Sequence, residues 1–113
     1  MSVARLYLYE IWRLAEKLIR EFGSLSYEKF AEDANRIESA VMRLAIMREG
    51  WSWLPVKMRE ELVPIEWSAV TGKWNLEAAR HVDVDSKQLW ETIVQGLPEL
   101  SRKAEELLKR QVE

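Results

Sequence analysis

The hydrophobic positions in the first half of the chain recur at the spacing of amphipathic helices. In residues 7–22, apolar side chains are separated by charged ones at this spacing, which predicts a helix of about five turns. Gly23 follows, and we expect it to end this helix in the left-handed conformation. A short capped turn with two aromatic residues is expected at 24–30. Asp33 is then the expected N-cap of a second long helix that runs to Trp51.

The second half is predicted to hold a short helix, an amphipathic segment and an extended connection. Pro55 suits the first turn of a short helix over Val56–Leu62, because its missing N–H is not needed there. The next segment places apolar residues on one side of a third helix: Trp67, Val70, Thr71, Trp74 and Ala78. The alternating residues 80–85 (RHVDVD) are expected to be an extended connection, because the sequence offers no partner strand.

The C-terminal part is predicted to form one long helix with an irregularity in its middle. Asp85 followed by Gln88 forms a capping box that opens this helix. Apolar residues keep helical spacing from Leu89 to Leu107, so the helix is expected to kink at Gly96–Pro98 and continue.

Length and composition favour a single domain over residues 1–113. The chain has 17 Lys and Arg against 19 Asp and Glu, one His and no Cys. A chain of this length buries about two thirds of its unfolded surface, so it needs neither a metal nor a disulfide for stability. We therefore predict an all-α fold, an up-and-down helical bundle of four main helices plus a short extra helix.

Charge and hydropathy narrow the possible partners. The net charge of −2 gives no basic bias for coating duplex nucleic acid, although a local patch could contact RNA. No apolar run approaches the ~18 residues of a membrane span, and charges interrupt the N-terminal hydrophobic positions. We therefore expect a cytoplasmic protein that does not enter a membrane.

The only histidine is the main candidate for chemistry. His81 follows Arg80 directly, and such a pair suits metal-independent RNA cleavage, in which His takes a proton from a 2′-hydroxyl and Arg stabilises the phosphate charge. Adjacent side chains point in different directions, however, so the sequence alone favours a solvent-facing His81. Asp83 and Asp85 lack further oxygen ligands, so no metal site is predicted. No cofactor is expected, since the chain has no glycine-rich phosphate loop.

Two of the six tryptophans flank one serine at the end of the second long helix. Residues two apart do not share a helix face, so Trp51 and Trp53 cannot both be buried there. We expect Trp51 in the core and Trp53 at a partner contact.

Short motifs along the chain resemble one protein family in their order and spacing. In the second half they are Leu54-Pro55, Arg59-Glu60, Ile65-x-Trp67, Gly72-x-x-Asn75, Val84-Asp85, Trp90-Glu91-Thr92 and Leu97-Pro98-Glu99-Leu100. Upstream they are Leu25-Ser26-Tyr27-Glu28-x-Phe30 and Leu44-x-Ile46-Met47-x-Glu49. This series resembles the HepT-like branch of the HEPN superfamily, ribonuclease toxins partnered by minimal nucleotidyltransferases. The resemblance covers about residues 24–108 and implies a helical homodimer with its cleft near the twofold axis.

The catalytic motif of that family is altered in this chain. The family has Arg-Asn, three residues and His, within a segment that resembles residues 72–85 (GKWNLEAARHVDVD). Asn75 is retained, but Trp74 occupies the position of the family's Arg and Ala79 that of its His. The tyrosine that the partner modifies in some members falls at His81. Since Trp carries no charge and Ala accepts no proton, we expect the inherited mechanism to be lost.

The resemblance leaves two main functions open. The first is a catalytically degenerate HepT-like HEPN protein of a toxin–antitoxin type system, a homodimer that binds a minimal nucleotidyltransferase. In it, Trp74 fills the vacated cleft rather than stacking RNA bases. The interface candidates are Val70, Trp74, Ala78 and Trp53. The second is an active, metal-independent endoribonuclease toxin that uses Arg80 and His81, with Lys73 and Asn75 as further candidates. A purely structural helical module is a third hypothesis.

Overall fold

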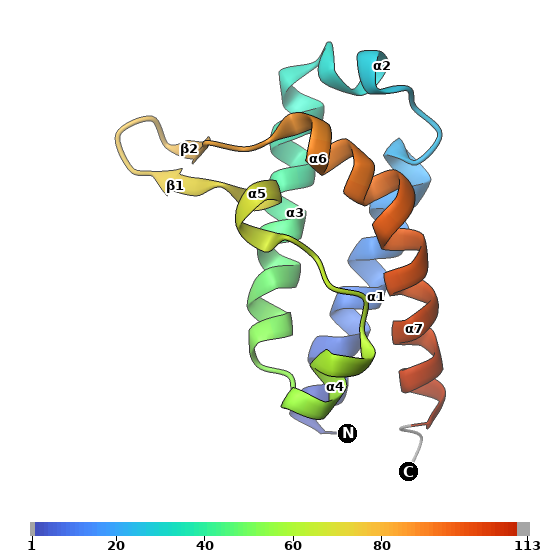
Figure 1. Ribbon diagram of the computed structural model, residues 1–113. Coiled ribbons are helices and arrows are strands. Elements are labelled where there is room, and N and C mark those ends of the chain that lie inside the picture. The colour runs from blue at the N-terminus through green and yellow to red at the C-terminus, as the bar shows by residue number, and fades with distance from the viewer. Residues whose placement is uncertain (1, 111–113) are drawn as a thin grey trace.

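The computed structural model describes residues 2–110, and most of this part of the chain is helical (Figure 1). In chain order the helices are α1 (Val3–Phe22), α2 (Tyr27–Ala31), α3 (Ala34–Ser52), α4 (Val56–Glu61), α5 (Trp67–Thr71), α6 (Ser86–Glu91), the π-helical turn η1 (Thr92–Gly96) and α7 (Leu97–Arg110). Two short antiparallel strands, β1 (Lys73–Asn75) and β2 (Arg80–Val82), form a hairpin between α5 and α6. The predicted all-α class is confirmed.

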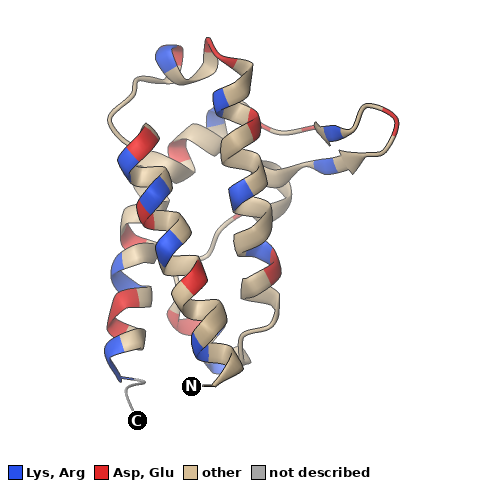
Figure 2. Cartoon of the chain, turned by 180° about the vertical axis from the view of Figure 1, so that it is seen from behind, with Lys and Arg blue, Asp and Glu red and all other residues tan. Residues whose placement is uncertain are grey.

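The core lies between the three long helical segments. Helix α1 packs against α3 and α7, and α5 and α6 close the space between α3 and the start of the C-terminal helix. Each long helix buries one apolar stripe, and most charged residues lie on the outer faces of the helices (Figure 2). The fully buried large side chains include Leu8, Ile11, Leu18, Phe30, Leu44, Met47, Leu89, Ile93, Leu97 and Leu100. Burial of each such side chain contributes about 1.5–3 kcal/mol to folding. None of the described helices has the length and hydropathy needed to cross a bilayer.

Short polar side chains cap the starts of several helices. Each capping side chain accepts a hydrogen bond from a backbone N–H in the first turn of its helix. The capping residues are Ser2, Ser26, Asp33 and Asp85. The caps predicted at Asp33 and Asp85 are thereby confirmed, the latter with Asp85 Oδ1 3.0 Å from the Gln88 nitrogen. Such a cap is typically worth about 1 kcal/mol.

Helix α1 ends at Gly23 for a reason other than the predicted one. Gly23 has φ −65° and ψ −22°, so the expected left-handed conformation is wrong. Its N–H donates to the carbonyl of Ile19, and a Cβ built on Gly23 would lie 2.5 Å from that carbonyl oxygen. Glycine is favoured here because a side chain does not fit.

The third predicted helix is shorter than expected. Helix α5 ends at Thr71, so the prediction that one helical face extends to Ala78 is wrong. Gly72 has φ +58° and ψ −143°, a conformation that residues with a side chain rarely adopt. The chain therefore leaves the helix and turns into β1. Residues 80–82, expected to be a connection, are the partner strand that sequence analysis did not find.

The C-terminal helix continues past its proline as predicted. Helices α6 and α7 are joined without a break by η1, and the two differ in direction (Figure 1). The irregularity is a π-helical turn over Thr92–Gly96, immediately ahead of Pro98. Proline lacks an N–H and its ring clashes with the carbonyl four residues earlier in a regular helix. A wider turn before Pro98 relieves both problems.

Candidate functional site

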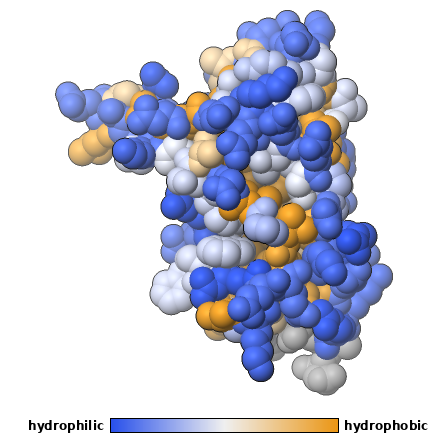
Figure 3. Space-filling view, in the orientation of Figure 1, coloured by the Kyte–Doolittle hydropathy of each residue, from blue (hydrophilic) through white to orange (hydrophobic). Residues whose placement is uncertain are grey.

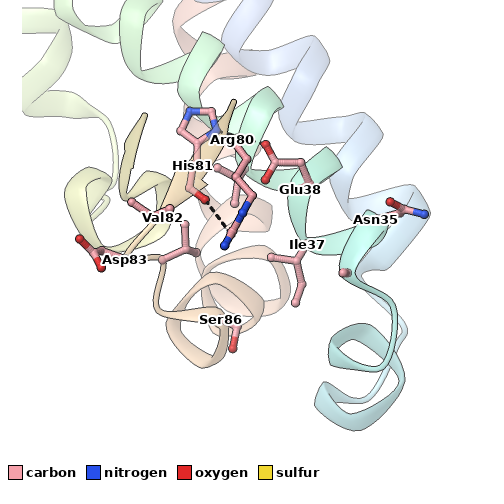
Figure 4. Close-up of a pocket in the computed structure, with 11 residues that line it drawn as sticks. Asn35, Ile37, Glu38, Arg80, His81, Val82, Asp83 and Ser86 are labelled. Carbon is pink, nitrogen blue, oxygen red and sulfur yellow. Dashed lines mark hydrogen bonds and ion pairs between the residues drawn. The ribbon is translucent and has the colours of Figure 1, made fainter. Parts of the chain in front are cut away.

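A groove of about 530 Å³ lies between the first half of α3 and the chain that forms β2 and leads into α6 (Figure 4). We call it the α3–β2 groove. One wall belongs to α3 and comprises Ala34, Asn35, Ile37, Glu38 and Val41. The other wall comprises Arg80, His81, Val82, Asp83, Val84 and Ser86. The groove thus contains Arg80 and His81, the pair that the sequence singled out for chemistry.

The hairpin fixes the position of this pair. Trp74 lies opposite His81, and Asn75 lies opposite Arg80, in the antiparallel register. The Asn75 side-chain oxygen accepts a hydrogen bond of 2.8 Å from the Ala78 N–H, which closes the turn between the strands. Ala79 has φ +53° and completes the reversal. Asn75 therefore has a structural role in the turn.

His81 is paired with a carboxylate from α3. Its Nδ1 lies 3.3 Å from Oε1 of Glu38, and only 11% of the His81 side chain is exposed, against 40% for Glu38. The expectation of a solvent-facing His81 is therefore wrong, because β1 and α3 cover the ring on two sides. When Nδ1–H donates to Glu38, Nε2 carries the lone pair and can accept a proton.

Arg80 supplies the positive charge of the groove. Its Nη1 lies 3.4 Å from the carbonyl oxygen of His81, and its side chain is otherwise exposed. Figure 4 shows Arg80 and His81 on the hairpin side of the groove, with Glu38 and Ile37 on the α3 side. A guanidinium at this place can bind an anionic oxygen beside the imidazole.

Trp74 and the other interface candidates do not share one surface. Trp74 is 54% exposed, and its ring meets that of His81 edge to face, with centroids 5.3 Å apart. Val70 is fully buried in α5, and Ala78 is exposed in the hairpin turn, so the expectation that the three lie on one side of a helix is wrong. Trp53 is exposed as predicted but lies at the end of α3, stacked on Tyr7.

The remaining sequence candidates lie outside the groove. Lys73 is exposed on β1, and neither it nor Asn75 belongs to the groove lining. Ala79 is exposed and offers no functional group. Sequence reasoning missed Glu38, which is 43 residues from His81. Its only signal is that it stands next to Ile37, in the apolar stripe of α3.

The site shows no arrangement suited to a metal ion. Within residues 2–110, no three His, Cys, Asp or Glu side chains gather closely enough to hold one. The Asp85 carboxylate caps α6, and Asp83 stands beyond β2 with φ +60°.

Comparisons with known proteins point to ribonucleases. A protein of Caldanaerobacter subterraneus subsp. tengcongensis named a putative RNase is 29% identical over 111 residues, which cover 98% of this chain and 99% of that protein. Two proteins of Methanocaldococcus jannaschii with the same kind of name are each 26% identical over 104 residues. These residues cover 91% of this chain and 85% and 89% of theirs. The chain is similar to proteins named as RNases over nearly its full length. No family model and no solved structure matches it.

Proposed function

We propose that this protein is a metal-independent endoribonuclease whose centre is the α3–β2 groove. The observation that carries the proposal is the pairing of His81 with Glu38 beside Arg80 in one groove. The similarity to proteins named as RNases supports the choice of RNA as substrate.

The proposed reaction uses the ribose 2′-hydroxyl as nucleophile. His81 takes the 2′-hydroxyl proton on Nε2, while Glu38 holds the ring and stabilises the imidazolium that forms. The 2′-oxygen then bonds to the adjacent phosphorus, and the bond from phosphorus to the 5′-oxygen breaks. The departing 5′-oxygen receives a proton from water, and His81 returns its proton to the solvent, which leaves a 2′,3′-cyclic phosphate and a 5′-hydroxyl. Arg80 stabilises the charge on the phosphate oxygens during this step.

Cleavage of a short RNA in excess chelator tests this proposal. We expect His81→Ala to lower the rate by roughly 10²–10⁴-fold, because the base is lost. Glu38→Gln and Arg80→Ala should also lower it. Glu32→Gln is the matched control for Glu38→Gln, since it removes a carboxylate outside the groove and should leave the rate unchanged.

Two results would contradict the proposal. One is the absence of cleavage by the wild-type protein, and the other is an equal rate in the His81→Ala protein. RNA with a 2′-deoxy sugar at the cleaved position must resist cleavage, since the mechanism consumes the 2′-hydroxyl.

A second candidate is the catalytically degenerate HepT-like HEPN protein, a cytoplasmic homodimer that binds a minimal nucleotidyltransferase in a toxin–antitoxin type system. It is favoured by the residues at the family's two catalytic positions, the exposed indole of Trp74 and the methyl group of Ala79. It predicts a dimer in solution, co-purification with a nucleotidyltransferase encoded nearby and no RNA turnover. Cleavage by a Trp74→Arg/Ala79→His double variant alone would support this candidate over the endoribonuclease.

A further inference from the structure

We infer that the Trp74 indole is a stacking platform for a base of single-stranded RNA, beside the proposed general base His81. This inference rests on the proposed function and adds the kind of substrate and the residue that positions it. It is carried by the exposure of Trp74 together with its ring contact to His81.

Trp74 differs from the buried and partly buried tryptophans in what covers its ring, and from the exposed Trp53 in that Trp53 stacks on Tyr7. Trp51 and Trp67 pack on each other, and Trp90 packs on Tyr27 and donates its indole N–H to a backbone carbonyl. Trp12 is partly buried against the core. Trp74 is 54% exposed, and its aromatic partner among the described residues is His81, whose ring it meets edge to face. More than half of the residue's surface is thus open to solvent.

The position of the hairpin makes the indole accessible to an unpaired strand. The hairpin projects from the helical body (Figure 3). Its surface is mostly hydrophilic, with a hydrophobic patch near its end. A base that stacks on an aromatic ring must be unstacked from its neighbours, which single strands allow and duplexes resist. The two ring centroids are 5.3 Å apart, so a strand with a base stacked on Trp74 passes near the proposed general base.

Two cations flank this platform. Lys73 precedes Trp74 on β1, and Arg80 precedes His81 on β2; both are exposed, and neither forms an ion pair with another described residue. Figure 2 shows basic positions on both strands and an acidic position in the turn. Phosphate groups on either side of the stacked base can therefore meet a positive charge. These charges favour RNA, rather than the apolar surface of another protein, as the ligand of Trp74.

The test measures binding of a short, single-stranded 2′-O-methyl RNA, which lacks the nucleophile and cannot be cleaved. We expect Trp74→Ala and Trp74→Leu to raise Kd by roughly 5- to 140-fold, the range that loss of one stacked base gives. Trp74→Phe keeps an aromatic face and should bind nearly as well as the wild type. Quenching of tryptophan fluorescence by the RNA should be lost in Trp74→Phe even though binding remains.

Trp53→Ala is the matched control. It removes a second exposed tryptophan that is 62% exposed at the far end of α3, and RNA affinity should stay unchanged. Light scattering on the same variants tests whether Trp74 instead contacts a second copy of the chain. If Trp74→Ala turns a dimer into a monomer and leaves RNA affinity unchanged, Trp74 is a protein contact and the inference is overturned.

The inference and the proposed function fail in different ways. Unchanged RNA affinity in Trp74→Ala and Trp74→Leu, or no binding by the wild type, overturns the platform even if the wild type cleaves RNA. Binding that depends on Trp74 without any cleavage of natural RNA keeps the platform and overturns the endoribonuclease.

Discussion

The helical body, formed by α1–α7, and the hairpin of β1 and β2 differ in how they treat apolar side chains. The body buries long apolar stripes and caps several of its helices with polar side chains. The hairpin has strands of three residues each and leaves two large apolar side chains, Trp74 and Leu76, exposed. Folding free energy therefore comes from the body, while the hairpin is positioned by the body and free to contact ligands.

The candidate site lies where these two regions meet. Glu38 belongs to α3, and His81 belongs to the hairpin, so their contact is one of the links between the two parts. At the base of the hairpin, a hydrogen bond of 3.0 Å from the Asp85 N–H to the Ala69 carbonyl joins the chain that leaves the hairpin to α5. The chemistry proposed for the groove depends on the hairpin holding this place.

The largest contrast is expected from matched leucine truncations in the two regions. Leu18→Ala should lower the free energy of unfolding by about 2–5 kcal/mol, because Leu18 is fully buried in α1 and a cavity would remain. Leu76→Ala should change it by less than about 0.5 kcal/mol, since Leu76 is 85% exposed. Urea unfolding measures both. Similar losses for the two variants would contradict the division into body and hairpin.

A smaller effect is expected from the glycine that starts the hairpin. Gly72→Ala should lower the local stability of the hairpin by about 1–3 kcal/mol, because alanine is strained at φ +58°. The new Cβ would also lie 2.1 Å from the Val82 carbonyl oxygen. Hydrogen exchange should speed up in the hairpin and stay slow in α1. In Gly50→Ala, the control, the Cβ would meet Tyr7 at 3.5 Å, an ordinary contact, and exchange in the hairpin should not change.

The smallest effect is expected from an ion pair on the surface of the body. The hydrogen bond from Arg43 lowers the pKa of Glu21 below 4.5. This pair therefore stabilises the fold above about pH 4.5, and the contribution is lost as the pH falls through the lowered pKa of Glu21. Because Glu21 is half exposed, we expect the pair to contribute about a few tenths of a kcal/mol to the free energy of unfolding. Thermal unfolding of Glu21→Gln across this pH range measures it. Glu77→Gln, in the hairpin turn, controls for removal of a carboxyl group. Equal pH dependence of the wild type and Glu21→Gln would refute the role of the pair.

The body could be predicted from the sequence because its signals are local. The apolar spacing of α1 and α3, and the caps at Asp33 and Asp85, each depend on residues within a few positions of one another. The place of Gly23 was predicted, but its conformation was not, since the fit of a Cβ against Ile19 depends on coordinates.

The hairpin and the site could not be predicted in the same way. Residues 80–85 alternate, but β1 is three residues long and shows no such pattern, and Trp74 was consistent with the apolar spacing of a helix. The contact of His81 with Glu38 joins residues 43 positions apart, and no spacing rule indicates it. The pair Arg80–His81 was named from its chemistry, while its burial against α3 required the fold.

The π-helical turn sets how far α7 is rotated about its own axis relative to α6. Leu89, Ile93 and Leu97 follow one another in two steps of four residues, and all three are fully buried. In a regular α-helix each such step overshoots one full turn by about 40°, so the third side chain would be rotated by about 80° away from the first. The wider turn over Thr92–Gly96 absorbs this excess. It lets α6, the first helix after the hairpin, and α7 direct their side chains into the same core.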